Sequence, residues 1–298
     1  MTIPRHTPYD GSSRLFQIGL KPLALADWID VDERLPSYLK EKDRLFRERP
    51  AEVFAAEAET KEAQRELLEL LVAHLPSRFP EIYRHDGDAM RIAPDAVVRL
   101  ESDDPPLLTA ARLVQDDLVL MRHGASGWRL VAASLSFPSS WRLGDKFGRP
   151  IHEVHGPVPG FGSGSRNADL IARMFDNMRP ETPVIRWNWS LYGDDRLFHP
   201  DAAGPQERRF GEGGRAEHIF LRSERQTLRL LPQSGNILFT IKIAVDPLES
   251  LERHSRRPEI AAALIAQLEA LTEEQLDYKG MTAERERVIA RLRELALP

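Results

Sequence analysis

The sequence predicts an α+β fold in which an antiparallel sheet lies between two helical parts. Residues 1–85 and 249–298 place apolar residues at helical spacing among charged ones, whereas residues 86–248 contain short runs rich in branched residues. Short turn-like segments join consecutive runs, which favours hairpins over a doubly wound parallel sheet. With 298 residues and no evident linker, we expect a single domain that spans 1–298.

Two helices are predicted in the N-terminal part. The first covers 36–49, and the second covers 50–75, where Leu67, Leu71 and Leu75 recur at helical spacing. Pro76 and Pro80 are expected to end this helical region. The part is interpreted as packing and support.

The middle part is predicted to contain most of the sheet. The expected strands lie at 96–100, 118–121, 128–133, 184–191, 218–231 and 237–245. Segments 123–127 and 232–236 have the composition of tight connections, which predicts a hairpin at each. A helix at 168–178 and a Gly- and Arg-rich loop at 201–215 interrupt the strands.

The C-terminal part returns to helix. The predicted helices cover 258–271 and 284–297, each with leucines along one face, and Gly280 is an expected stop between them. Together the parts predict a curved antiparallel sheet with helical additions at both ends.

Composition excludes several classes of chemistry. The chain has no cysteine, so disulfides, thiolate nucleophiles, thiolate-held iron–sulfur clusters and thiolate-ligated haem are excluded. A net charge of -5 gives no global positive field for nucleic acid. The N-terminus does not resemble a signal peptide, and no stretch approaches the length of a membrane span. We expect a cytoplasmic protein without a nucleic-acid or membrane partner.

Common catalytic and phosphate-binding motifs are absent. The sequence contains no GxxxxGK[ST], no complete GxGxxG, no HExxH and no GxSxG. The GSG at 162–164 lacks the third glycine of the dinucleotide fingerprint and is interpreted as a turn.

Two histidines precede an unusual proline-rich stretch. His152 and His155 are three residues apart, and the prolines of GPVPG at 156–160 fix the following backbone. The pair could share a helical face as metal ligands, but no further ligand follows at zinc-site spacing. Spacing alone favours the plainer interpretation, a loop with two ordinary histidines.

The segment 221–232 has a strand-like alternation of charged and polar residues. Its two faces would carry Arg222, Glu224, Gln226 and Leu228, and Ser223, Arg225, Thr227 and Arg229. One face could present a cation, a carboxylate and an amide to a pocket, although composition alone favours a solvated face. Trp187 and Trp189 share a strand face, an arrangement more typical of core packing than of a cofactor wall.

An ordered set of segments resembles the haem-dependent oxidative N-demethylase family, α-subunit-like group. The set comprises FQIGLKPL at 16–23 with Trp28, FPSSW at 137–141, HGPVPG at 155–160, RWNWS at 186–190, ERQTLR at 224–229, LFTI at 238–241 and YKG at 278–280. The family pattern has a single histidine before Ala-Pro-Val-Pro, which matches His155, with Gly156 in place of the alanine.

The resemblance implies a haem-binding domain of the PAS type. It also implies oxidation of a small methylamine such as dimethylamine by O2, with formaldehyde as a product and NADPH as the ultimate electron source. Without cysteine or a Rossmann fingerprint in this chain, the electrons must come from a separate reductase subunit or a ferredoxin-type donor that carries the flavin or iron–sulfur group. The oligomeric state is left open.

Site residues follow from this resemblance. His155 is the expected iron ligand of haem b, because the chain offers no thiolate. Arg142, Lys146, Arg222 and Trp189 are expected around the cofactor, with Arg142, Lys146 or Arg149 paired with a propionate. Glu224 is expected to bind the protonated amine, and Arg225 or Gln226 to stabilise negative charge on oxygen.

A second function class stays open at this point. PAS-type domains also serve as non-catalytic sensors that bind haem or a small ligand. A sensor is expected to carry an output domain, and the C-terminal helices lead to none in this sequence, which favours the enzyme.

Overall fold

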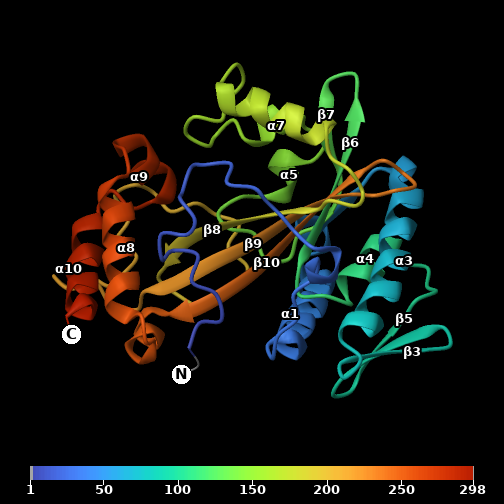
Figure 1. Ribbon diagram of the computed structural model, residues 1–298, viewed down its shortest axis with the longest axis horizontal. Coiled ribbons are helices and arrows are strands. Elements are labelled where there is room, and N and C mark those ends of the chain that lie inside the picture. The colour runs from blue at the N-terminus through green and yellow to red at the C-terminus, as the bar shows by residue number, and fades with distance from the viewer. Residues whose placement is uncertain (1–2, 298) are drawn as a thin grey trace.

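The computed structural model describes residues 3–297 and confirms an α+β fold (Figure 1). A seven-stranded antiparallel sheet has the order β1-β8-β9-β10-β6-β7-β2, and a separate three-stranded sheet has the order β3-β4-β5. The strands of the large sheet are β1 (Lys21–Pro22), β2 (Phe54–Ala56), β6 (Asp117–Gly124), β7 (Gly127–Ser134), β8 (Val184–Tyr192), β9 (Phe220–Leu230) and β10 (Ile237–Pro247). The small sheet comprises β3 (Tyr83–Asp86), β4 (Ala89–Ile92) and β5 (Ala96–Arg99).

Both predicted hairpins are confirmed. β6 pairs with β7 around the turn at 125–126, and β9 pairs with β10 with Leu230 opposite Ile237. The expected strand at 96–100 forms, but it belongs to the small sheet rather than to the large one. The N-terminal part contributes more than helices, because β1 and β2 form the two edges of the large sheet.

The predicted helix over 50–75 is wrong in its first half. Helix α1 (Leu35–Glu48) forms as expected, but only a single helical turn, α2 (Pro50–Val53), follows it. The chain then enters β2, which pairs with β7, so sheet pairing overrides the helical pattern there. Helix α3 (Lys61–Arg78) starts after a 3-10 turn and contains Pro76 in its last turn, so that proline does not end it. Helix α4 (Pro106–Ala111) packs against α3.

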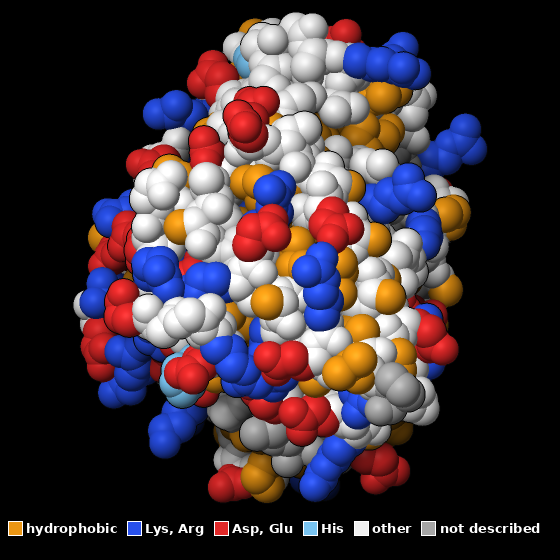
Figure 2. Space-filling view, turned by 90° about the vertical axis from the view of Figure 1, so that its left-hand side faces the viewer, with side chains coloured by type: hydrophobic (Ala, Val, Ile, Leu, Met, Phe, Trp, Pro, Cys, Tyr) orange, Lys and Arg blue, Asp and Glu red, His pale blue; other side chains and the backbone are white. Residues whose placement is uncertain are grey.

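Helices of the middle and C-terminal parts agree with the sequence. Short helices α5 (Leu143–Lys146) and α6 (Ile151–Val154) precede α7 (Arg166–Asp176), whose N-terminus is capped by the Ser165 hydroxyl. At the C-terminal end, α8 (Arg257–Glu269) and α10 (Arg285–Ala296) pack together, and α9 (Glu273–Lys279) lies between them in sequence. Positive and negative side chains are interspersed on the face in view in Figure 2, which is the α8 and α10 side of the molecule in Figure 1.

The two faces of the large sheet are covered by different elements. We call one the back face; α3 and α4 pack on it at the β6–β7 end, and α8 and α10 pack on it at the β8–β9 end. We call the other the cavity face; the segment from α5 to α7 covers it with Leu143, Phe161, Ile171 and Phe175. Over residues 3–297, no helix combines the length and apolar composition needed to cross a membrane.

Candidate functional site

An open cavity lies on the cavity face, between the sheet and the segment from α5 to α7. Its volume is about 210 Å³, and the space between its walls rises to about 1310 Å³ when the adjoining open solvent is included. Apolar side chains form most of the wall, among them Met121, Leu228 and Phe239 from the sheet and Trp141, Val158 and Phe161 from the covering segment. Such a lining suits an apolar ligand with a few polar groups.

Strand alternation places a polar group at one end of this cavity. Because successive side chains of a strand point to opposite faces, Glu224 and Gln226 of β9 face the cavity together with Leu228. The antiparallel register sets Asn188 of β8 opposite Glu224, and Arg186 opposite Gln226. Four polar side chains from two adjacent strands therefore meet on one buried surface.

The Glu224 carboxylate is held in place by two amides. Asn188 Nδ2 donates to Glu224 Oε1 at 3.0 Å, and Gln226 Nε2 donates to Glu224 Oε2 at 2.7 Å. Glu224 is 7% exposed, so the alternative that composition alone favours, a solvated face, is wrong for this residue. The two donors fix the carboxylate plane and satisfy part of its hydrogen-bonding capacity, and its remaining lone pairs are free to accept from a ligand.

Three cations line the cavity around this carboxylate. Burial lowers the pKa of Lys146 and of Lys279 to about 8, although the charge of Glu224 opposes the shift in both. Burial also lowers the pKa of the Arg186 guanidinium, although the negative charge of Glu224 raises it. The Arg186 Nε is buried and has no hydrogen-bond partner among residues 3–297. An excess of cations over carboxylates makes the cavity suited to an anionic group.

His155 lines the same cavity. It follows α6, where its N–H donates to the Ile151 carbonyl at 3.1 Å, and its ring lies 6.2 Å from that of Phe161. Burial, together with the positive charges of Lys146 and Arg186, lowers the pKa of the imidazole to about 4. A neutral imidazole has a free ring nitrogen lone pair, which is the form that binds a metal. Within residues 3–297 the ring nitrogens of His155 make no hydrogen bond, so no protein group fixes the orientation of the ring.

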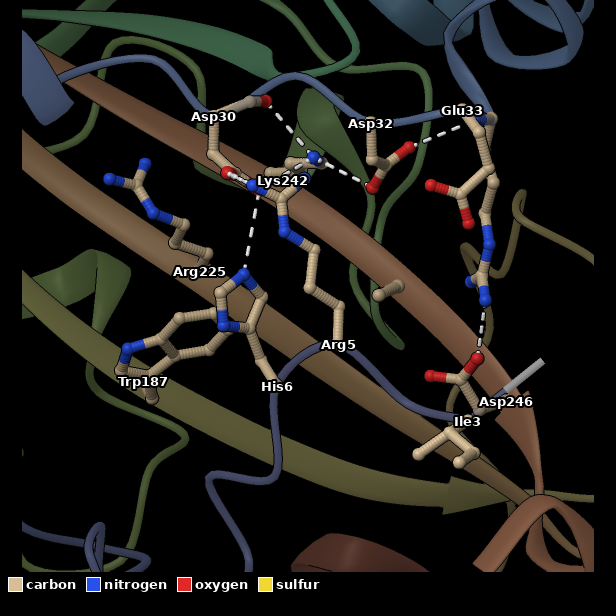
Figure 3. A pocket seen from close by; sticks show the side chains of 12 residues that line it. Ile3, Arg5, His6, Asp30, Asp32, Glu33, Trp187, Arg225, Lys242 and Asp246 are labelled. Carbon is tan, nitrogen blue, oxygen red and sulfur yellow. Dashed lines mark hydrogen bonds and ion pairs between the residues drawn. The ribbon is translucent and has the colours of Figure 1, made fainter. Parts of the chain in front are cut away.

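Arg225 lies away from the cavity. Its side chain points to the back face, where it donates to the backbone carbonyls of Asp27 and Trp28. Figure 3 shows it beside Trp187, near Lys242 and Asp30, in a small pocket with a volume of about 30 Å³. The alternation that brings Glu224 and Gln226 into the cavity is the reason that Arg225 cannot reach it.

Three further predicted residues also have other partners. Arg222 is buried and donates to Ser139 Oγ and to the carbonyls of Phe137 and Leu197, so its guanidinium is occupied by the scaffold. Trp189 is 2% exposed and packs against Tyr9 on the back face, which is the core packing typical of such a pair. Arg142 is exposed and forms an ion pair with Asp201. The structure brings together only His155, Lys146, Glu224 and Gln226.

Several cavity residues were missed, although the ordered segments contained them. Arg186 and Asn188 lie in the same segment as Trp189 but on the opposite strand face, and Lys279 lies in the last turn of α9. Gly280 then ends α9 with a φ of +60°, a conformation that glycine adopts without strain. Phe16, Ile18 and Leu20 of the N-terminal segment complete the wall. Strand parity could have identified Arg186 and Asn188.

The cavity meets the requirements of a haem site. Its walls are apolar, it holds one neutral histidine, and its cations can pair with propionates. Within residues 3–297 no group of three or more His, Asp or Glu side chains could hold a metal ion by itself. A single imidazole beside a broad apolar surface fits an iron whose other ligands would come mainly from a macrocycle and not from the protein.

Comparison with known sequences gives one result at the level of the family. No curated protein matches the chain at a significant level. A family model described as haem-dependent oxidative N-demethylase, alpha subunit-like, matches residues 19–289. This range contains the described cavity residues from Leu20 to Lys279 and covers most of the chain. The chain belongs to the haem-dependent oxidative N-demethylase alpha-subunit-like family.

Proposed function

We propose that this protein binds haem b through His155 and oxidatively demethylates a small methylated amine. The observation that carries the proposal is a neutral imidazole in the same apolar cavity as a fixed carboxylate. The family membership supports haem dependence and a demethylase role. The PAS-type character of the domain and dimethylamine as the substrate remain parts of this proposal.

The haem would supply the iron centre at which O2 is reduced and a methyl group is oxidised. The chain's own groups would bind and orient the other participants. His155 would offer a ring nitrogen lone pair to the iron, and Arg186 would pair with a propionate, since a guanidinium can donate two parallel hydrogen bonds to a carboxylate. Lys146, which also lines the cavity, is a second candidate for this electrostatic role.

Glu224 would bind the amine. A secondary amine is protonated at pH 7, so its N–H groups can donate to the carboxylate oxygens, and Glu224 can accept a proton from that nitrogen. Gln226 and Asn188 would act as positioning residues, since each donates to one oxygen of Glu224. This geometry gives Gln226 a role at the carboxylate in place of a role at oxygen. We assign Arg225, Arg222, Trp189 and Arg142 to the scaffold, because their partners lie outside the cavity.

Electrons would come from another polypeptide. The family is alpha-subunit-like, which implies a partner subunit or electron-transfer system. The chain contains no cysteine with which to hold an iron–sulfur cluster. We therefore infer a reductase partner that carries a flavin or a cluster and draws on NADPH.

A haem titration of two histidine variants tests the proposal. His155→Ala should lose stoichiometric haem uptake and the Soret band of the histidine-ligated form, whereas His152→Ala, which removes the second imidazole of the same segment, should retain both. Unchanged haem binding and spectrum in His155→Ala would overturn the ligand assignment. Addition of dimethylamine to the haem-loaded protein should shift the Soret band. A bound haem that responds to no amine would instead favour a non-catalytic haem protein.

A further inference from the structure

Three lysines of the described chain share a lowered pKa but differ in their partners. Burial lowers the pKa of Lys42, Lys146 and Lys279 to about 8 in each case. Lys42 donates to three backbone carbonyls, including that of Val114 at 2.9 Å. Lys279 donates to the Trp189 carbonyl and the Ser190 hydroxyl, both at 2.9 Å. Both ammonium groups are therefore used to hold the fold together.

Lys146 has no such use. Over residues 3–297, its Nζ makes no hydrogen bond and no ion pair, and its nearest recorded partner is the face of Trp141, 4.3 Å from the ring centroid. It is the last residue of α5 and lines the cavity that contains His155 and Glu224. A half-buried lysine in a largely apolar cavity, without a protein acceptor for its amine, is the kind that serves as an amine nucleophile in proteins.

We propose that Lys146 Nζ is a covalent acceptor site for small aldehydes, in particular formaldehyde released within this cavity. The aldehyde source rests on the proposed function, since oxidative loss of an N-methyl group produces formaldehyde. In the step, the Nζ lone pair forms a bond to the carbonyl carbon, the C=O π bond breaks, and a proton moves from nitrogen to oxygen to give a carbinolamine. Protonation and loss of water then give an iminium ion. Hydrolysis reverses both steps, so no oxidant or reductant is required.

The cavity favours this reaction at Lys146 over the other lysines. Because the pKa of Lys146 is lowered to about 8, its neutral fraction near pH 7 is roughly 300-fold larger than that of a lysine with the ordinary pKa. Lys279 has a similar pKa but must give up two hydrogen bonds before its lone pair can react. Capture at Lys146 would retain a reactive product inside the protein until water or an acceptor amine removes it.

Reductive trapping tests the site without any turnover. Full-length protein, with and without added haem, is treated near pH 7 with limiting formaldehyde and cyanoborohydride, which converts the iminium into a stable N-methyl group. Peptide mapping then follows methylation at Lys146, at Lys279 and at the exposed Lys61. We expect Lys146 to be methylated at least about tenfold faster than Lys61, and Lys279 to lag behind Lys146. Lys146→Arg keeps the cation and should abolish the fast methylation.

The outcomes separate this inference from the proposed function. Methylation of Lys146 no faster than that of Lys61, or faster methylation of Lys279, would overturn the inference. Complete protection of Lys146 from methylation when haem is bound would also overturn the inference, because the Lys146 amine would then be occupied by the cofactor. Each result is obtained with added formaldehyde, so it stands whether or not the protein oxidises an amine. If it does, cyanoborohydride added during turnover should methylate Lys146 without external formaldehyde.

Discussion

Charged residues on the two faces of the large sheet differ in how they are paired. On the back face, Arg225 donates to the Asp27 and Trp28 carbonyls. On the cavity face, Arg186 of the neighbouring strand has a buried Nε that finds no partner among residues 3–297, and the contact recorded for the Lys146 amine is an aromatic ring. Arg225 is buried, whereas Arg186 and Lys146 are half-buried. Arg229, also on the back face, likewise has a buried Nε with no partner in this range and lies over the Trp28 ring, so the difference is one between particular residues and not between whole faces.

The back face also pairs its lysine. Lys242, opposite Arg225 in the sheet, contacts Asp30 Oδ2 at 2.7 Å and Asp32 Oδ2 at 2.8 Å (Figure 3). Buried charges are stable when they are paired and hydrogen-bonded, and costly when they are not. We infer that Arg225 and Lys242 use their charge for stability, whereas Arg186 and Lys146 keep charge available for ligands, at a cost in stability.

The largest expected effect is on the back face. Lys242→Met should destabilise the protein by about 3–5 kcal/mol, because it removes the buried cation shared by the half-buried Asp30 and Asp32, of which Asp30 keeps Arg5 at 3.0 Å. Urea unfolding measures the change, and the exposed Lys40 provides a control, since Lys40→Met should change stability by less than about 0.5 kcal/mol. Equal effects of the two variants would contradict the assignment of the Lys242 charge to stability.

The same cluster predicts how stability depends on pH. Burial by itself would raise the pKa of Asp30 and Asp32, but nearby groups lower both below their usual value: the Lys242 charge and hydrogen bond act on both carboxylates, and His6, 3.6 Å from Asp30, acts on Asp30. Because the folded pKa lies below the unfolded one, their contribution is full above pH ~4 and is lost as the pH falls through the folded pKa. Urea midpoints should therefore decrease below pH ~4. A double variant, Asp30→Asn with Asp32→Asn, should show a flatter dependence; an unchanged slope would contradict it.

Arg225→Met should have an intermediate effect. It removes the donors to the buried Asp27 and Trp28 carbonyls, which predicts a loss of about 1–3 kcal/mol. Haem affinity, measured by Soret titration of the folded variant, should stay as in the unaltered protein. If Arg225→Met lost haem binding or the spectral response to amine while keeping its stability, Arg225 would have to be assigned to the functional site and not to the scaffold.

The sequence predicts the sheet better than the site. Branched runs and turn residues are local signals, so both hairpins and the C-terminal helices could be located. The strand at 54–56 could not, because it forms only by pairing with β7, more than 70 residues away. A helical pattern from 50 to 75 hides that long-range pairing.

Partners outside the segment decide which charged residues serve the site. Strand parity correctly separates Glu224 and Gln226 from Arg225, but it also groups Arg222 with them. Carbonyls at Phe137 and Leu197, distant in sequence, occupy Arg222. Arg186 points to the same face of the sheet as Arg222, but its Nε has no hydrogen-bond acceptor among residues 3–297. No local pattern contains this difference.

Arg186→Met should have the smallest effect on stability. Unlike Lys242→Met and Arg225→Met, it should not destabilise the protein. The variant removes an Nε that is buried and has no partner among residues 3–297. It also removes a guanidinium whose charged form is disfavoured by burial and favoured by the charge of Glu224. The free energy of unfolding of the cofactor-free protein should therefore stay equal or rise, by at most about 1 kcal/mol. Haem affinity should fall at the same time, because a propionate loses its guanidinium. The exposed Arg179 is the matched control, since Arg179→Met should change neither quantity. A loss of stability without a loss of haem affinity would place Arg186 with Arg225 in the scaffold, and the contrast between these two residues would no longer hold.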